Sequence, residues 1–136
     1  MVGIVIVSHS PKVASSVEEL IKKLVGDENL NIKGVGGVTG DPTAFGTDPL
    51  KVKRAIEEVF DGEGVVVIGD IGSAIVGTRA ALAMLPKEIK EKVIIADAPL
   101  VEGAFVAAVE ASTGSSLEEV AKAAHEAYKM NKLKKS

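Results

Sequence analysis

The chain has 136 residues, 46% of them hydrophobic, and a formal net charge of −3. This is the size of one ordinary domain, long enough to bury a single hydrophobic core. A nucleic-acid partner is not expected, because a phosphate backbone attracts basic surfaces and only 3% of the residues are aromatic. The chain has no cysteine, which excludes disulfide bonds, a thiolate nucleophile and a cysteine-based metal site.

The hydrophobic residues occur in short runs. None approaches the roughly 18 consecutive apolar residues of a transmembrane helix, so we expect no membrane association. The first ten residues, MVGIVIVSHS, lack the basic leader and the cleavage site of a secretory signal, and they predict a buried strand instead. We therefore expect a cytoplasmic protein with a single domain over residues 1–130, followed by a basic C-terminal tail over residues 131–136.

Four short runs of aliphatic and β-branched residues predict strands: Val2–Val7, a weaker run at Leu30–Val35, Val65–Ile68 and Val93–Ala96. Each run is continuous rather than alternating, which is typical of strands covered on both faces in a parallel sheet. Between them lie segments with apolar residues at helical spacing. Ser10-Pro11 and Asp48-Pro49 each provide a cap followed by proline at the first helical position.

Ser116 and Glu119 have the spacing of a capping box and open a final amphipathic helix. The predicted order alternates strand and helix and ends in two helices. This order favours an α/β fold with an open, mostly parallel sheet of four strands and helices on both faces. The irregular stretch Gly34–Thr47 contains five glycines and a proline, and we expect a functional or mobile loop there.

Four segments lie at the ends of the predicted strands: Ser8-His9-Ser10, the glycine-rich Gly34–Gly37, Gly69–Ser73 and Asp97-Ala98-Pro99. In such a sheet, ligands and chemistry gather beyond the carboxyl ends of the strands. His9 is the best candidate for chemistry, because a neutral imidazole is a good nucleophile near pH 7 and can carry a phosphoryl group. A helix beginning near Pro11 would add free backbone N–H groups that favour an anion.

Asp70 ends the predicted central strand and could accept a hydrogen bond from one ring nitrogen of His9, leaving the other nitrogen free to attack. The alternative for Asp70 is a turn or cap residue, and a lone histidine at a strand end can also merely pack. Gly72 permits close backbone approach, and Ser73 could cap the third helix while donating to phosphate. Ser8 and Ser10 would add hydroxyl donors. Thr47-Asp48 most simply caps the second helix, and the alternative for Thr47 is a place beside the phosphate.

Other patterns are uninformative or negative. The glycines near Gly34 match neither a dinucleotide-binding turn nor a phosphate loop, so bound ATP is not expected. No histidine or carboxylate pair has convincing metal-ligand spacing, so no metal site is predicted. Glu102 could be a helix-start carboxylate or a partner contact, and His125 is interpreted as structural.

These residues together resemble a known family, the EIIA-like domain of the phosphotransfer subunit of phosphoenolpyruvate-dependent dihydroxyacetone kinase. That domain is related to the mannose-type EIIA domains of the sugar phosphotransferase system. The matching stretches are IVIVSHS at 4–10, FGTDPLKVKRAIE at 45–57, VVVIGDIGSA at 65–74 and APLVEGAFVAAV at 98–109. They span nearly the whole chain.

The resemblance implies a mannose-EIIA-like homodimer in which His9 is phosphorylated by an HPr-type phosphocarrier protein. The phosphoryl group would then pass to ADP held on the nucleotide-binding kinase subunit, so that no cofactor is bound by this chain itself. Asp70 would be the partner of His9. Because no HPr-like domain is fused to this chain, we expect the donor to be a separate protein. The resemblance leaves open which ring nitrogen of His9 is phosphorylated.

Three alternatives share parts of this pattern. A mannose-type EIIA domain would use the same His9 but deliver the phosphoryl group to an EIIB partner. The resemblance implies that such a domain has a Gly-Gly-Ser-Pro run after the aspartate that corresponds to Asp70. This chain has Gly72-Ser73-Ala74 in that place. A small metal chelatase would need a second histidine near a later strand end. A receiver-like module with Asp70 as phosphoacceptor would need an acidic pair after the first strand. The residues favour the kinase-linked domain.

Overall fold

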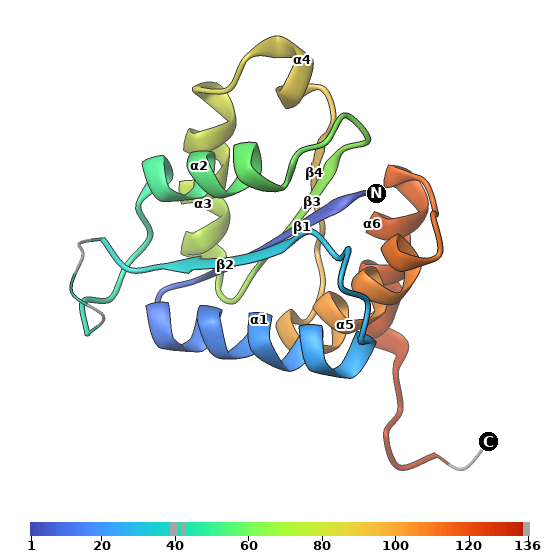
Figure 1. Cartoon of the computed structure of the whole chain (residues 1–136). Helices are drawn as coiled ribbons and strands as arrows, with labels where there is room; N and C mark the ends of the chain where they lie inside the picture. Colours follow the sequence, from blue (N-terminus) through green and yellow to red (C-terminus); the bar gives the residue numbers. More distant parts are fainter. Residues whose placement is uncertain (39–40, 42, 135–136) are drawn as a thin grey trace.

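A computed structural model describes residues 1–38, 41 and 43–134 of the chain. Four strands form one parallel sheet in the order β2-β1-β3-β4 (Figure 1). The strands are β1 (Gly3–Ser8), β2 (Ile32–Gly36), β3 (Val65–Gly69) and β4 (Val93–Ile95). The helices are α1 (Pro11–Val25), α2 (Pro49–Val59), α3 (Gly72–Ala83), α4 (Lys87–Lys90), α5 (Leu100–Ser112) and α6 (Leu117–Glu126), followed by the 3-10 helix η1 (Ala127–Lys129). The predicted fold class is confirmed.

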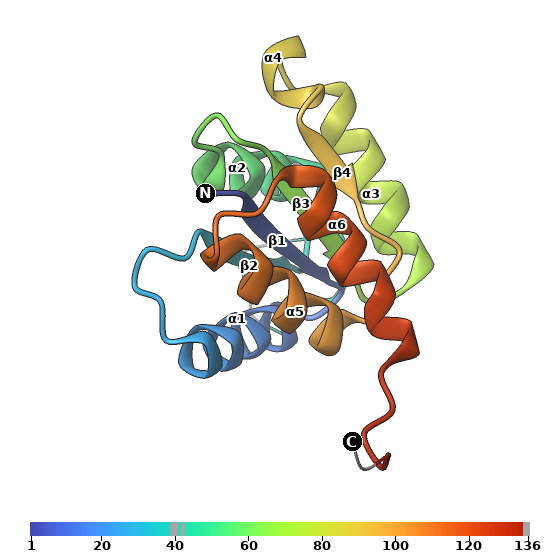
Figure 2. The same ribbon diagram turned by 90° about the vertical axis from the view of Figure 1, so that its right-hand side faces the viewer.

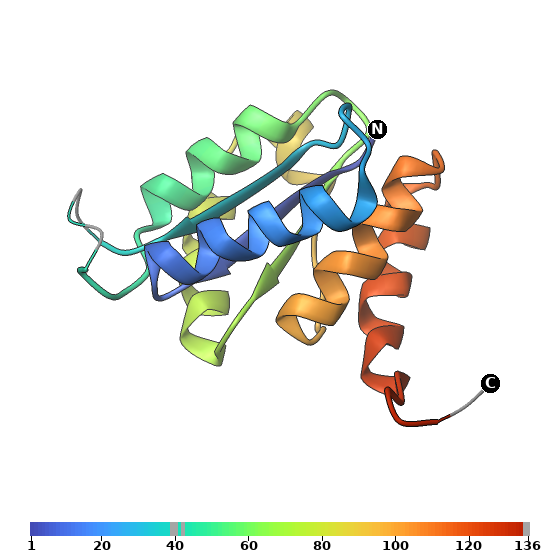
Figure 3. The same cartoon turned by 60° about the horizontal axis from the view of Figure 1, so that its bottom comes forward.

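Helices cover both faces of the sheet. α2 and α3 pack together on one face, and α1, α5 and α6 lie on the other, as the turned views in Figures 2 and 3 show. Each face has its own apolar core, which follows from the alternation of side chains along a strand. Ile4 and Ile6 enter the core under α1 and α5, whereas Val5 and Val7 enter the core under α2. The central strand β1 is buried at every residue.

The predicted caps are present. The Ser10 hydroxyl accepts a hydrogen bond from Val13 N at 3.2 Å, and the Asp48 carboxylate accepts one from Leu50 N at 3.0 Å. Ser116 and Glu119 form the complete capping box at the start of α6. These bonds satisfy backbone N–H groups that have no partner inside the helix.

The structure differs from the sequence-based prediction most at β2 and at α4. The predicted strand Leu30–Val35 runs from Ile32 to Gly36, so the stretch predicted as a loop from Gly34 onward begins only after Gly36. Gly34 is suited to this place because a Cβ atom there would lie 2.2 Å from the carbonyl oxygen of Ala14 on α1. The short helix α4 was also not predicted, because four residues are too few to show a helical repeat. Within the described part of the chain, no helix has the length and apolar character needed to span a bilayer.

The strand order creates a switch point between β1 and β3. From β1 the chain crosses to β2 on one side, whereas β3 and β4 follow on the other side. The two loops that leave β1 and β3 therefore diverge at the carboxyl edge of the sheet. Open α/β sheets place their ligand sites in such crevices. His9 and Asp70 each stand one residue beyond the two strands that flank this point.

Candidate active site

His9 and Asp70 are in direct contact at the switch point. The ring nitrogen Nδ1 of His9 lies 2.9 Å from Oδ1 of Asp70, and the backbone N–H of His9 donates to Oδ2 at 3.1 Å. The two side chains are about one-quarter and one-fifth exposed, respectively. The strands fix this contact, because Val7 is paired with Gly69 in the sheet and Asp70 N donates to Val7 O at 3.0 Å. The structure thus brings together the predicted pair.

Four donors surround the Asp70 carboxylate. Besides the two groups of His9, Ser8 Oγ donates to it at 2.9 Å and Ile71 N at 2.8 Å. Partial burial on its own would raise the pKa of Asp70, but the hydrogen bonds from His9 N–H, Ser8, the His9 ring and Ile71 together hold that pKa below its usual value. A carboxylate that stays ionised accepts the proton of Nδ1 and therefore selects the tautomer with a lone pair on Nε2.

Ser8 has a different place from the one expected. Its hydroxyl points to Asp70 and also accepts from Ser10 N at 3.1 Å, and the residue is only 1% exposed. The expectation that the Ser8 hydroxyl donates a hydrogen bond to phosphate was therefore wrong. Instead it orients the carboxylate that orients His9. The strand alternation could have suggested this, because Ser8 and His9 leave β1 on opposite faces.

Ser73 contacts the other ring nitrogen, with its Oγ at 2.5 Å from His9 Nε2. The expectation that Ser73 caps α3 was wrong: Ile71 occupies the cap position, and no side chain caps this helix. The first turn of α3 therefore keeps backbone N–H groups that no side chain satisfies, which is an arrangement that favours an anion. A Cβ atom at Gly72 would meet nothing within 4 Å, so the approach to this turn is open.

Ser10 and Thr47 are less directly placed. Ser10 lines the hollow in front of His9, but its hydroxyl is engaged as the cap of α1. The Thr47 hydroxyl is buried and has no hydrogen-bond partner among the residues that the structure describes. Its methyl group abuts α3, where a Cβ atom at Gly77 would lie 2.5 Å from Thr47 Cγ2. A role in binding phosphate stays a prediction for both residues.

The hollow in front of His9 measures about 490 Å³ and has an apolar rim. Phe45, Ile71 and Val13 line it and are 70%, 65% and 44% exposed. Exposed large apolar side chains grouped in this way mark a surface for another macromolecule. Sequence reasoning missed this rim, because single apolar residues in loops carry no periodic signal.

The remaining candidates lie elsewhere. Across the described ranges, no group of three or more acidic or histidine side chains could hold a metal ion. His125 Nδ1 lies 2.6 Å from the backbone oxygen of Asp97, and Tyr128 donates to the Asp97 side chain at 2.8 Å, so both connect the last helices to the segment that follows β4. Glu102 is in the first turn of α5 and pairs with Lys132. Of the expected basic tail, residues 135 and 136 lie outside the described part.

Comparison with known proteins defines the class. Residues 3–121 match the model of the EIIA-man family, which is described as the PTS system fructose IIA component. The chain therefore belongs to the EIIA-man family of phosphotransferase-system components.

Within this class, the curated relatives that the chain matches are DhaM subunits. The chain is 42% identical over 120 residues to "PEP-dependent dihydroxyacetone kinase 2, phosphoryl donor subunit DhaM" of Listeria innocua, covering 88% of this chain and 94% of that protein. It is 39% identical to the DhaM of Escherichia coli over 88% of this chain but 25% of that protein. The chain spans about a quarter of the length of the longer relatives from enterobacteria.

Solved structures agree with the fold. A crystal structure of a protein of unknown function superimposes with a TM-score of 0.79 at 30% identity, covering 93% of this chain and 95% of the other. The EIIA component of Streptococcus agalactiae superimposes with a TM-score of 0.67 at 15% identity, over 93% and 92% of the two chains. The second likeness concerns the fold alone.

Proposed function

We propose that this protein is a phosphoryl carrier in which Nε2 of His9 holds the phosphoryl group. The donor is the phosphohistidine of an HPr-type phosphocarrier, and the acceptor is ADP on the nucleotide-binding subunit of a dihydroxyacetone kinase. The observation that carries the proposal is the placement of the His9 ring between Asp70 at Nδ1 and Ser73 at Nε2. The DhaM names of the relatives support the choice of acceptor.

In the first step, the lone pair on Nε2 attacks phosphorus while the nitrogen–phosphorus bond of the donor histidine breaks. Asp70 keeps the proton on Nδ1 and stabilises the ring as it becomes positively charged. In the second step, a terminal phosphate oxygen of ADP attacks phosphorus and the Nε2–phosphorus bond breaks, which yields ATP and restores His9. Neither step needs a group bound permanently by this chain.

The transferred phosphoryl group carries its charge on three equatorial oxygens, so catalysis depends on alignment and on donors around them. The uncapped first turn of α3 and the Ser73 hydroxyl provide such donors. In this proposal Ser73 turns from the ring nitrogen to a phosphoryl oxygen when Nε2 becomes bonded to phosphorus. The apolar rim of Phe45, Ile71 and Val13 excludes water when a partner protein covers the site.

The test is labelling with phosphorylated HPr. We expect the protein to take up one acid-labile, base-stable phosphoryl group, as phosphohistidine does, and His9→Gln to take up none. Chemical lability of the opposite kind would indicate an aspartyl phosphate and overturn the assignment, as would labelling of the variant.

The acceptor is tested separately. Labelled protein should lose its phosphoryl group to the ADP-loaded kinase subunit. The description of the family model names a fructose IIA component, so a sugar-transport IIB domain is the alternative acceptor. Transfer to such a domain and none to the kinase subunit would replace the proposed acceptor while leaving the role of His9 intact.

A further inference from the structure

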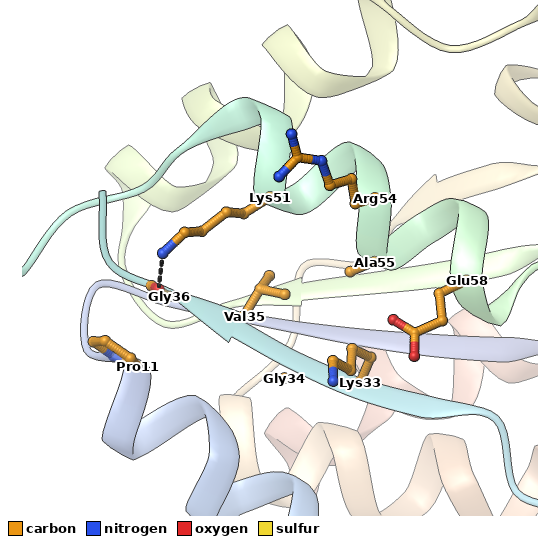
Figure 4. A pocket seen from close by; sticks show the side chains of 9 residues that line it. All are labelled: Pro11, Lys33, Gly34, Val35, Gly36, Lys51, Arg54, Ala55 and Glu58. Carbon is orange, nitrogen blue, oxygen red and sulfur yellow. Dashed lines mark hydrogen bonds between the residues drawn. The ribbon is translucent and has the colours of Figure 1, made fainter. Parts of the chain in front are cut away.

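A second hollow, of about 300 Å³, follows the outer edge of the sheet between β2 and α2 (Figure 4). We call it the edge groove. Its lining begins at Pro11, which follows the cap of α1 beside the active site, and ends at Glu58 on α2. Three cationic side chains line it: Lys33 from β2, and Lys51 and Arg54 from α2. No residue of the edge groove belongs to the contacts around His9.

The charge of the edge groove is unbalanced. The chain as a whole carries −3, yet the groove has three cations and a single carboxylate, Glu58. Within the described ranges, neither the Lys33 side chain nor the Arg54 side chain makes an ion pair or a hydrogen bond. By contrast, Lys53 on the same helix pairs with Glu57 at 3.1 Å. Lys33 and Arg54 are therefore two cations of the groove whose charge no carboxylate of the described residues neutralises through a direct ion pair.

The edge of β2 is not arranged to accept another strand. The N–H of Gly34 already donates to the Glu18 carboxylate at 2.8 Å, and the carbonyl oxygen of Gly36 accepts from Lys51 Nζ at 3.5 Å. Side chains thus occupy two backbone groups that an added strand would use, which is a usual protection of sheet edges. An occupant of the edge groove would be recognised by charge and not by main-chain pairing.

We propose that the edge groove docks an acidic segment of a partner protein that exchanges the phosphoryl group with His9. This inference rests on the proposed function. Figure 4 shows the cationic side chains distributed along the groove and not converging on one point, which fits an extended segment with several carboxylates better than a single small anion. Because the groove begins at Pro11, a partner placed over His9 can reach it. Complementary charge speeds encounter and fixes orientation in transient complexes.

The test compares two double variants of equal charge. Lys33→Glu with Arg54→Glu reverses the groove. Lys87→Glu with Lys122→Glu makes the same change in net charge at two exposed lysines that lie outside the groove, on α4 and α6. Transfer into His9 from phosphorylated HPr and out of His9 to the ADP-loaded kinase subunit is measured at low and at physiological ionic strength. Labelling of His9 by phosphoramidate, a small donor that needs no docking, is measured in parallel.

We expect the groove variant to raise KM for one of the two proteins by about tenfold at low salt and to lose most of the salt dependence of that step. The control variant and the labelling by phosphoramidate should stay unchanged. Lys33→Gln with Arg54→Gln should give a smaller rise, which guards against a folding defect of the reversed variant.

Equal KM values for the groove variant and the wild type with both proteins would overturn the proposal. So would equal rises in the groove and control variants, because these would reflect net charge alone. If the wild type takes up no phosphoryl group from either HPr or phosphoramidate, the proposed function itself fails. That outcome is distinct from a normal wild type with an unaffected groove variant.

Discussion

At the scale of single residues, the site is a series of hydrogen bonds in which each side chain orients the next. Ser8 holds Asp70, Asp70 holds Nδ1 of His9, and Ser73 meets Nε2. Each member limits the freedom of the next, so the His9 ring, whose Nε2 is the proposed nucleophile, already has a fixed orientation in the free protein. Such alignment lowers the cost of reaching the geometry of transfer.

Replacement of the carboxylate tests this alignment. Asp70→Asn should slow phosphoryl transfer at least about 100-fold, because an amide cannot stabilise the charged ring and can select the wrong tautomer. Asp97→Asn is the matched control, since Asp97 follows the neighbouring strand but contacts Tyr128 and His125 instead of His9. A rate near that of the wild type for Asp70→Asn would make Asp70 a structural residue only.

The same carboxylate links stability to pH. The pKa of Asp70 is lower in the folded protein than its ordinary value of 3.8. As the pH falls, Asp70 is therefore protonated in the unfolded chain before it is protonated in the folded one. Its contribution to the free energy of unfolding is complete above about pH 4 to 5 and is lost as the pH falls through the folded pKa. The free energy of unfolding can be measured with denaturant at intervals of about one pH unit between roughly pH 6 and pH 3. As the pH falls, it should decrease less steeply in Asp70→Asn than in the wild type. An identical slope in both proteins would contradict the prediction.

Replacement of Thr47 tests whether its hydroxyl binds the phosphoryl group. Its buried hydroxyl has no partner within the described residues, and such a group costs about 1–3 kcal/mol. Thr47→Val keeps the shape and removes the hydroxyl, so we expect a higher midpoint of thermal unfolding. If Thr47 donates to the phosphoryl group, the variant should also transfer more slowly. A stabilised variant with unchanged transfer would exclude Thr47 from the site.

At the scale of elements, Gly34 and Gly72 have different surroundings, and we expect different effects when each is replaced. Gly34 lets α1 lie directly on β2, whereas Gly72 begins α3 facing open space. One glycine therefore serves packing, and the other keeps the approach to the first turn of α3 clear. The sequence shows both simply as glycines beside polar residues.

Alanine at each position separates the two roles. Gly34→Ala would place its Cβ atom 2.2 Å from Ala14 O, and we expect a loss of about 1–3 kcal/mol in the free energy of unfolding. Gly72→Ala should leave stability within about 0.5 kcal/mol but slow phosphoryl transfer. Chemical denaturation and labelling by phosphorylated HPr measure the two effects. Equal stability of the two variants would contradict the packing argument.

At the scale of the whole molecule, the hollow in front of His9 lies at the carboxyl edge of the sheet and the edge groove lies along the outer strand β2. The apolar rim surrounds His9, and the edge groove begins beside it at Pro11. An apolar patch therefore lies next to a cationic one, and the proposed partner would contact both. The expected homodimer stays a prediction, and light scattering should give twice the mass of the 14.0 kDa chain.

The sequence by itself determined the alternation of strands and helices, the parallel sheet and the places of His9 and Asp70 directly after two strands. These follow from local patterns, because continuous apolar runs, caps and polar strand ends are each contained in a few neighbouring residues. Only the tertiary structure decided that Nδ1 of His9 faces Asp70, that Ser8 donates to Asp70, and that Ser73 contacts Nε2 without capping α3. It also decided the edge groove, since Lys33 and Arg54 line one groove only after β2 and α2 pack. Contacts across a fold depend on the register and distance between elements, which no local pattern contains.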